Sequence, residues 1–279
     1  GWFHNNALAM LDLALLPYLK SLLPLHAKAG AQPDNLCGPY WIGLLLQTYG
    51  ISVSAVEVAI AAATVLPSQG NPTDWLPAGA TSRQGRHYDQ IPTVPNVDAA
   101  GTAIIGLMQA TEQLSQGRFS LLPLTTDDWA AGLQTVWQLC QAQPEYQAIP
   151  LLNVHTSYFW GSKLTPLQAM TYLAGGTIPP PPPDWRVGHF ALLAGQLQGP
   201  VQSLYALLDT YPQFGWQGLH LQPPIAVSQS LARPQQSDQG GLALFVETAW
   251  RSRLADAITR AGLHIEPWDN GSPAPFCPE

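Results

Sequence analysis

Cys37 is the residue of this sequence that is best placed to act as a nucleophile. It lies at a turn directly before an apolar helical run, with Pro39 inside the first turn, where a missing amide removes no helical hydrogen bond. A thiol at a helix N-terminus lies near unpaired amides and the positive end of the helix dipole, both of which favour the thiolate. The setting therefore predicts nucleophilic chemistry, although an isolated cysteine is more often a small buried hydrophobe.

Two residues further along the chain could activate this thiol. His189 is near the start of one apolar segment and Asp209 near the end of the next, with Gly199 in the polar stretch between them. If the segments form an antiparallel hairpin with its turn centred near Gly199, His189 and Asp209 stand directly opposite each other, about 5 Å apart at Cβ. We therefore predict that Asp209 accepts the imidazole N–H and orients His189, which acts as the base.

Each of these two residues also has a plain structural interpretation. His189 could be a core histidine that is bonded to a backbone carbonyl. Asp209 could be a turn former at a strand end, although a carboxylate that ends an apolar strand needs a partner. The catalytic interpretation is favoured because the three residue types occur together, in this order, in these local settings.

A resemblance to a known family rests on three short segments. They are Asn35-Leu36-Cys37-Gly38-Pro39, Gly188-His189-Phe190 and Leu208-Asp209-Thr210-Tyr211. In type and order they resemble the papain-like cysteine peptidase clan, and within it the bacterial double-glycine leader peptidases and the phytochelatin synthases. The resemblance implies a papain-like α+β fold and acyl transfer through a thioester, with the acyl group passed to water or to an amine.

The oxyanion hole is where the sequence departs from this family pattern. Members commonly carry a Gln six residues before the cysteine, whereas this position is Ala31 and the nearest Gln is Gln32. We predict that Gln32, or Asn35 in its place, donates to the oxyanion together with the Cys37 backbone amide. Loss of one such donor typically lowers the rate about a hundredfold or more.

Five residues near these motifs or in an aromatic loop are predicted to contact substrate. They are Tyr40, Trp41, His155, Trp160 and Gly188. For His155 a capped strand end is the alternative interpretation. The low charge and the many aromatic residues suggest a cleft for an uncharged or apolar segment of a peptide.

The composition excludes several classes of function. The formal net charge is -7 and no basic cluster is interleaved with aromatic residues, so nucleic acid is a poor partner. The three cysteines are an odd number without a CxxC pair, which argues against a disulfide framework and a structural zinc site and fits a reducing, cytoplasmic location. No motif indicates a metal or an organic cofactor. Residues 7–25 are apolar but contain Asp12, Lys20 and two prolines, which predicts a packed helix rather than a membrane span.

Hydrophobic periodicity predicts a single catalytic domain of the α+β class. Its residues 1–145 are expected to form a mainly helical subdomain, and residues 146–279 a mainly antiparallel sheet that carries His189 and Asp209. Residues 67–95 lack periodicity and are interpreted as a substrate-facing or mobile loop. Helices are predicted at residues 37–49, 54–65, 98–114, 126–141, 165–173 and 251–261, and strands at residues 148–155, 187–194, 204–210 and 242–247.

Together these features predict cysteine-dependent acyl transfer on a peptide or amide substrate, with peptidase activity as the main hypothesis. One alternative is a phytochelatin-synthase-like transpeptidase, acyltransferase or amide-forming enzyme that uses the same thioester. Another is a catalytically silent papain-like domain that binds a peptide. The sequence makes no prediction of the oligomeric state.

Overall fold

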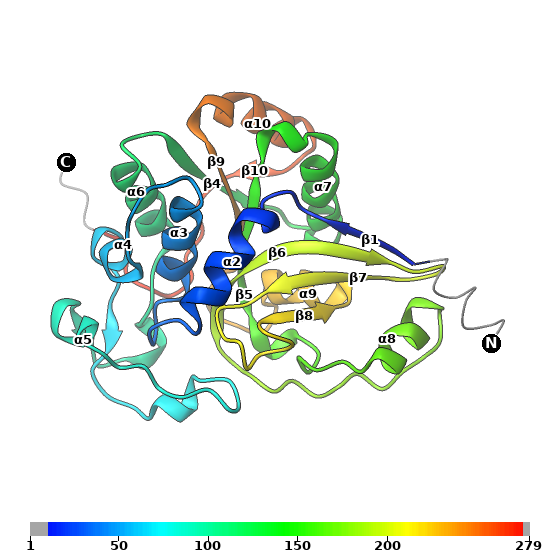
Figure 1. Cartoon of the computed structure of the whole chain (residues 1–279), viewed down its shortest axis with the longest axis horizontal. Coiled ribbons are helices and arrows are strands. Elements are labelled where there is room, and N and C mark those ends of the chain that lie inside the picture. Colours follow the sequence, from blue (N-terminus) through cyan, green and yellow to red (C-terminus); the bar gives the residue numbers. More distant parts are fainter. Residues whose placement is uncertain (1–10, 276–279) are drawn as a thin grey trace.

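The apolar segments of the second half form most of a large antiparallel sheet in the computed structural model, which describes residues 11–275 (Figure 1). The sheet runs in the order β10-β4-β9-β5-β6-β7-β8, and β1 pairs with the far end of β6. Most of its strands consist largely of buried residues, because helices cover both faces of the central part. The strands are β1 (Asp12–Leu15), β4 (Phe119–Thr125), β5 (Ile149–His155), β6 (Gly188–Gln198), β7 (Ser203–Leu208), β8 (Leu219–Gln222), β9 (Gly241–Glu247) and β10 (His264–Ile265).

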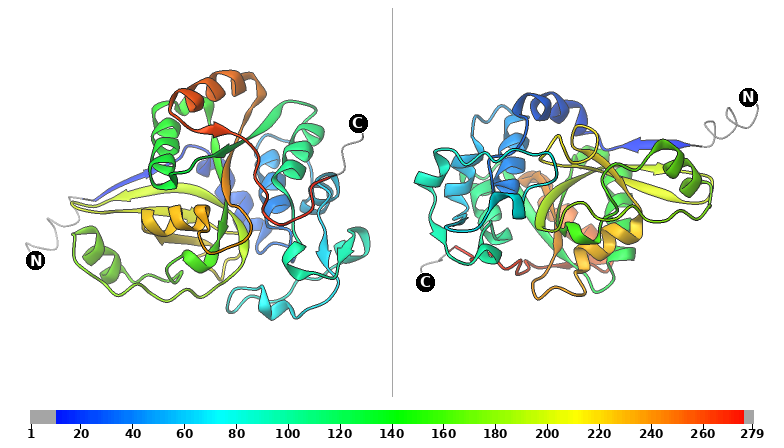
Figure 2. Two further views of the ribbon diagram at one scale, coloured as in Figure 1. Left: turned by 180° about the vertical axis from the view of Figure 1, so that it is seen from behind. Right: turned by 90° about the horizontal axis from the view of Figure 1, so that it is seen from below.

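Three helices from the first half gather on one side of this sheet. Figure 2 shows α3, α4 and α6 together beside the sheet, with α9 on the opposite side of β5 and β7. The α-helices of the described residues are α2 (Leu19–Ala29), α3 (Cys37–Gln47), α4 (Ala55–Ala61), α5 (His87–Gln90), α6 (Ile104–Leu114), α7 (Trp129–Ala142), α8 (Pro166–Leu173), α9 (Pro224–Ala232) and α10 (Thr248–Arg260). The chain is thus of the mixed α+β class, with a large antiparallel sheet.

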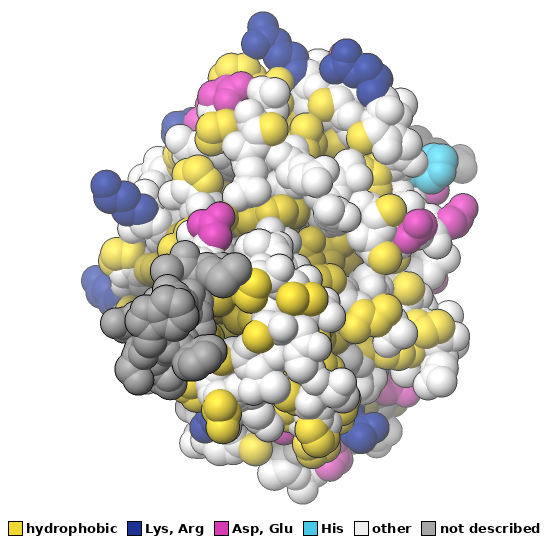
Figure 3. All heavy atoms as spheres, turned by 90° about the vertical axis from the view of Figure 1, so that its right-hand side faces the viewer, with side chains coloured by type: hydrophobic (Ala, Val, Ile, Leu, Met, Phe, Trp, Pro, Cys, Tyr) yellow, Lys and Arg dark blue, Asp and Glu magenta, His cyan; other side chains and the backbone are white. Residues whose placement is uncertain are grey.

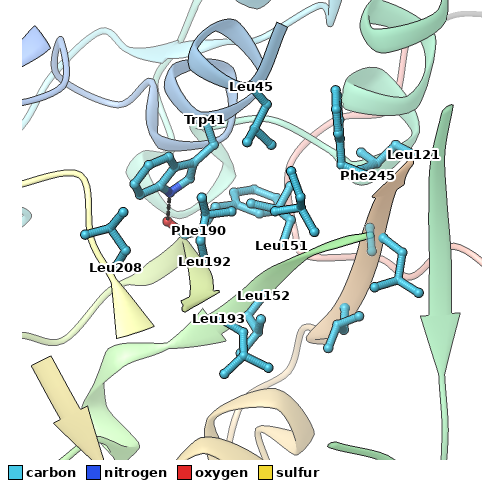
Figure 4. Close-up of a cluster of buried hydrophobic side chains, with 14 of the residues drawn as sticks. Trp41, Leu45, Leu121, Leu151, Leu152, Phe190, Leu192, Leu193, Leu208 and Phe245 are labelled. Atoms are coloured by element: carbon cyan, nitrogen blue, oxygen red, sulfur yellow. Dashed lines mark hydrogen bonds between the residues drawn. The ribbon is translucent and has the colours of Figure 1, made fainter. Parts of the chain in front are cut away.

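Helix α3 is the element that carries Cys37, and it lies in the core. Its residues from Gly38 to Leu46 are all buried, as expected for a helix that is apolar on every face. Figure 4 shows Trp41 and Leu45 pointing toward β6, where the Trp41 Nε1–H donates to the Phe190 carbonyl at 3.0 Å. Because this packing fixes α3 against β6, it also fixes the start of the helix beside the start of the strand.

Gly38 is required for this close approach. A Cβ at this position would lie 2.9 Å from Leu107 of α6 and 3.2 Å from Phe190 of β6. Asn35, in the loop before the helix, has a positive φ of 65°, a conformation that asparagine tolerates better than most residues. The loop therefore turns sharply before Cys37 and places the thiol beside the start of β6.

Side-chain caps begin two of the helices. Ser54 and Glu57 form a capping box on α4, and the Asp128 carboxylate accepts from the Ala131 N–H at the start of α7. The helix predicted over residues 98–114 begins later than expected: Asp98 lies in a short 3-10 helix, Val97–Ala99, and α6 begins at Ile104. Gly101 separates the two helices with a positive φ of 124°, which ends the first before the second begins.

The single N-terminal helix predicted for residues 7–25 is also wrong over its described part. Residues 12–15 form β1, and α2 begins only at Leu19; residues 7–10 lie outside the described residues. Pro17 prevents a continuous helix, and the long β6 offers its edge to β1 between Gly195 and Gln198. The division into a helical and a sheet part also needs correction, because β4 from the first half pairs with β9 inside the sheet.

The aperiodic segment 67–95 is ordered by short elements and by one buried carboxylate. Strands β2 (Leu66–Pro67) and β3 (Thr93–Val94) pair across its ends. Two residues of the segment are bound by the Asp34 carboxylate, which accepts from the Ser82 hydroxyl at 2.6 Å and from the Arg83 N–H at 2.8 Å. Asp34 stands three residues before Cys37, so this segment is fastened directly to the loop that presents the thiol.

The surface reflects the low proportion of charged residues, which is 10%. On the face shown in Figure 3, charged side chains lie mostly toward the edges, and apolar side chains are scattered among uncharged polar ones. None of the described helices is long and apolar enough to cross a membrane.

Candidate active site

Cys37, His189 and Asp209 are brought together at one end of the central strands, where β6 begins and β7 ends. Cys37 is half-buried at the first position of α3, and the His189 ring forms a hydrogen bond with its thiol. His189 Nε2 lies 2.8 Å from Asp209 Oδ1, and both of these side chains are buried. Because a carboxylate only accepts, Nε2 carries the proton of this bond, which leaves Nδ1 for the thiol.

The predicted register that led to this pairing is wrong, although the side chains meet. Leu192 pairs with Leu208, and beyond a bulge at Ala194 Gln198 pairs with Ser203, so the turn lies after Gly199 rather than on it. Asp209 is therefore two positions diagonal to His189 instead of directly opposite. Diagonal neighbours on one face of a sheet remain within reach of long side chains, and the 2.8 Å contact is made in this way.

Electrostatics in this pair favour the charged forms. Burial alone would raise the pKa of Asp209, but the adjacent His189 and then His220 hold it well below its usual range. Burial would likewise lower the pKa of His189, but the negative charges of Asp209 and of a Cys37 thiolate raise it above its usual value. The pair is therefore suited to an imidazolium that is stabilised between a carboxylate and a thiolate.

Trp185 covers the imidazole, and sequence reasoning missed this role. Its ring centroid lies 4.5 Å from that of His189, and its indole N–H donates to the Trp75 carbonyl at 2.9 Å. The indole shields the His189–Asp209 bond from solvent, which strengthens it. The available signal was an aromatic residue four positions before the histidine, at the end of a proline run.

Three further polar residues surround Asp209 and were also missed. The Thr210 N–H donates to Asp209 Oδ1 at 2.8 Å, and His26 bonds the Asp209 backbone carbonyl at 2.7 Å. His220 is completely buried, with its Nε2 3.4 Å from Asp209 Oδ2. Of these three, only His220 offered a signal in the sequence, because His220 and Gln222 alternate with leucines in a short strand.

The two predicted oxyanion donors occupy different positions. The Gln32 side chain is buried, accepts from the Thr210 hydroxyl at 2.5 Å and donates to the Pro33 carbonyl at 3.1 Å. It does not line the cavity beside Cys37, whereas Asn35 does. The Asn35 amide donates to the Tyr88 hydroxyl at 2.9 Å, so it is held in place at the cavity wall.

A cavity of about 630 Å³ opens beside Cys37 and His189, and two of the five predicted substrate contacts, His155 and Gly188, line it. The other three residues do not line this cavity. Tyr40 is buried and bonds the Gly30 carbonyl at 2.6 Å, and Trp41 bonds Phe190 in the core. Trp160 packs against Tyr172 in a separate apolar cluster.

The cavity wall is more polar than the predicted cleft for an uncharged or apolar segment. It carries both signs of charge, from Asp74, Asp98, Arg186, Arg233 and Asp238. The predicted loop, residues 67–95, contributes Asp74 and Trp75 to this wall. Asn270, Gly271 and Ser272 near the C-terminus complete the wall, although no sequence motif pointed to them.

Nothing in the described part of the chain resembles a metal centre. Among residues 11–275, no group of three or more His, Cys, Asp or Glu side chains could hold an ion. The chemistry that this arrangement can perform with its own side chains is nucleophilic attack by a thiol, with a histidine to transfer protons.

Comparison with known proteins gives a family without an assigned activity. Residues 16–269 match the model of a family described as "Family of unknown function (DUF6885)". This match includes Cys37, His189 and Asp209 and almost all of the described elements. No curated protein matches the chain.

Proposed function

The chain belongs to the DUF6885 family of unknown function, and we propose that it is a papain-like cysteine enzyme that transfers an acyl group from a peptide or amide. The observation that carries this proposal is the hydrogen-bonded series Cys37–His189–Asp209 at the wall of a large cavity. A buried histidine and aspartate alone would be compatible with a structural role. A half-buried thiol at a helix start, bonded to that histidine and facing a cavity, favours catalysis.

In the first step, Cys37 Sγ attacks the carbonyl carbon of the substrate amide. The C–N bond then breaks, and the imidazolium of His189 gives its proton to the departing amine. The acyl group remains on Sγ as a thioester. Asp209 keeps Nε2 of His189 protonated and stabilises the imidazolium, so that Nδ1 exchanges the proton with the thiol and the leaving group.

In the second step, the deprotonated His189 removes a proton from an incoming water molecule. The water oxygen attacks the thioester carbon, the C–S bond breaks, and the acid product and the Cys37 thiolate are released. The Cys37 backbone amide at the start of α3 and the Asn35 side chain at the cavity wall are the proposed donors to the oxyanion in both steps. Gln32 has a different role, in which it ties Thr210 and hence Asp209 to the nucleophile loop.

Hydrolysis is the outcome that we favour, because the cavity wall is polar and charged rather than a dry apolar surface. A reducing compartment would keep the Cys37 thiol available. The charges of both signs around the cavity suit a peptide better than an apolar acyl chain.

The direct test is to capture the acyl-enzyme. The protein is mixed with p-nitrophenyl acetate, quenched in acid and digested, and the acetyl group is located by mass spectrometry. We expect rapid acetylation at Cys37 that is nearly absent in His189→Ala. If acetylation occurs equally in both proteins, or mainly on lysines, the proposal is wrong.

The fate of the acyl group separates hydrolase from transferase. Acetylated enzyme is offered glycinamide at increasing concentration, and free acetate and N-acetylglycinamide are quantified. Release as acetate alone supports hydrolysis, and a dominant amide product would instead assign a transferase.

A further inference from the structure

Asp209 lies between two buried histidines, one at each carboxylate oxygen. Oδ1 is 2.8 Å from His189 Nε2 and accepts the Thr210 N–H at 2.8 Å. Oδ2 is 3.4 Å from His220 Nε2 on β8. Within the described residues neither Oδ2 nor His220 Nε2 has a hydrogen-bond partner of good geometry, so each is the nearest available partner of the other.

The protonation of His220 follows from its neighbour Gln222. The Trp160 N–H donates to Gln222 Oε1 at 2.8 Å, and Gln222 Nε2 donates to the Trp160 carbonyl at 3.0 Å. A flipped amide would place two acceptors together, so this orientation is fixed. Gln222 Nε2 is also 3.2 Å from His220 Nδ1, which must therefore accept. The proton of the His220 ring is thus on Nε2, the nitrogen that faces Asp209.

Apolar rings hold His220 in this position. Phe214 and Phe159 pack on its ring with centroid distances of 4.7 and 5.4 Å, and its side chain has no exposed surface. Among the titratable groups of residues 11–275, Asp209 is the one paired with it; His189 of β6 and His26 of α2 contact Asp209, and Cys37 of α3 contacts His189. A buried N–H next to a buried carboxylate oxygen, in apolar surroundings, is an effective charge-stabilising pair.

We propose that His220 is a positioning residue of the Cys37 site, whose Nε2–H holds the Asp209 carboxylate so that Oδ1 faces His189. The inference rests on the proposed function, since positioning is meaningful only if His189 serves Cys37. This role differs from a purely structural one, because the rotation of the Asp209 carboxylate sets the direction of the hydrogen bond between Oδ1 and His189 Nε2. Without a donor at Oδ2, the carboxylate would be freer to turn and would take up a proton at higher pH.

The test compares two substitutions of His220 by the rate of Cys37 alkylation with iodoacetamide between pH 4 and 9. His220→Met fills the space without a donor, and His220→Gln restores an N–H near Nε2. We expect Cys37 of His220→Met to be alkylated about tenfold or more slowly, because one hydrogen bond to a charged group is lost. The acidic limb of the profile, which is the pH range where the alkylation rate falls on acidification, should move to higher pH. His220→Gln should restore most of the alkylation rate and return the acidic limb to its wild-type position. A profile of His220→Met equal to that of the wild type, or an acidic limb moved to lower pH, overturns the proposal.

Thr111→Val is the matched control, because Thr111 is also buried but its hydroxyl donates to the Leu107 carbonyl within α6, away from Asp209. It should lower stability without moving the acidic limb. If it moves the limb as much as His220→Met does, the effect belongs to general loosening and the proposal fails.

A measurement on the wild-type protein covers the case in which His220→Met does not fold. Nitrogen NMR of the histidine rings at pH 7 should show the His220 ring with its proton on Nε2, its signal being identified by loss in His220→Gln; His26 and His87, whose Nε2–H groups donate to backbone carbonyls, should give separate signals that persist in this variant. A proton on Nδ1 would contradict the inference. This readout does not depend on Cys37, so a failure of the proposed function, seen as an unreactive Cys37, is distinguishable from a failure of the His220 contact.

Discussion

At the scale of single residues, Asp209 is the group on which the polar contacts of the site converge. Its carboxylate contacts His189, His220 and the Thr210 amide, and its backbone carbonyl binds His26. A fully buried carboxylate without such partners would be strongly destabilising. The choice of Cys37, His189 and Asp209 could be made from the sequence because each had a distinctive local setting. His220 and Trp185 offered only weak signals in the sequence, because it is the tertiary packing that brings them to the site.

Neutralising this carboxylate is expected to reduce Cys37 reactivity. Asp209→Asn keeps the size of the side chain but removes the charge that stabilises the imidazolium, so alkylation of Cys37 at pH 7 should slow about a hundredfold or more. Asp256→Asn, an exposed site on α10, is the control and should react like the wild type. Equal rates in all three proteins would show that Asp209 has no part in activating the thiol.

The raised pKa of His189 predicts how stability depends on pH. The folded protein keeps a proton that the unfolded chain releases above about pH 6.5, so this contribution is complete below that pH and is lost as pH rises through the folded pKa. The free energy of unfolding should therefore fall between pH 6.5 and 9, by at most about 1.4 kcal/mol per pH unit from this group. Urea titrations at several pH values should show that the free energy of unfolding falls less steeply with pH in His189→Gln than in the wild type. Parallel curves for the two proteins would be evidence against a raised His189 pKa.

The lowered pKa of Asp209 has the opposite sign. Its contribution is present above the unfolded value of about 4 and is lost as the pH falls toward the folded pKa. The ion pair is therefore most stabilising between about pH 4 and 6.5, where both contributions are complete.

At the scale of elements, the sequence indicated most helices and central strands but not their exact pairing. Alternating and apolar runs identify strands such as β5, β6 and β9. The register of β6 with β7 depends instead on the bulge at Ala194, for which the sequence has no reliable signal. Strand β1 was missed because its exposed residues lack a core-facing pattern, and it is held only by the edge of β6.

Gly195 allows β1 to pair at this bulge. A Cβ there would lie 2.6 Å from the Ala14 carbonyl oxygen, so Gly195→Ala should separate β1 from β6 and cost about 1–3 kcal/mol of stability. Hydrogen exchange should show faster exchange at β1, while Cys37 alkylation is preserved. Gly85→Ala is the control, because a Cβ at this position would lie no closer than 3.6 Å to another residue, and it should behave as the wild type. Unchanged exchange in Gly195→Ala would contradict this account of the bulge.

At the scale of the whole molecule, one continuous core joins the helices to the sheet. A single apolar cluster contains buried residues from Leu16 to Trp268. The sequence predicted the helical side and the sheet side, but not that the C-terminal segment returns to connect them. Asp269 bonds Gln239 beside the sheet, and Asn270 bonds the Thr102 carbonyl beside α6. Such long-range contacts leave no local pattern in the sequence.

Trp268 anchors this returning segment, since its buried ring packs directly over Gly241 at the start of β9. Trp268→Ala should lower the free energy of unfolding by about 3–5 kcal/mol, measured by urea denaturation. Trp216, which is 44% exposed, is the matched control, and its replacement by alanine should change stability far less. Similar losses in the two variants would contradict the anchoring role.

The central claim is that Cys37 is a nucleophile activated by His189, and the protein contains its own reference thiol for testing it. Cys140 is buried, and burial raises its pKa to about 12. The decisive measurement is the rate of iodoacetamide labelling of each cysteine at pH 7, followed by peptide mass spectrometry in the wild type and in His189→Ala. We predict fast, stoichiometric labelling of Cys37 that is lost in His189→Ala, with Cys140 unlabelled in both. Labelling of Cys37 as slow as that of Cys140, or equally fast in both proteins, would contradict the account.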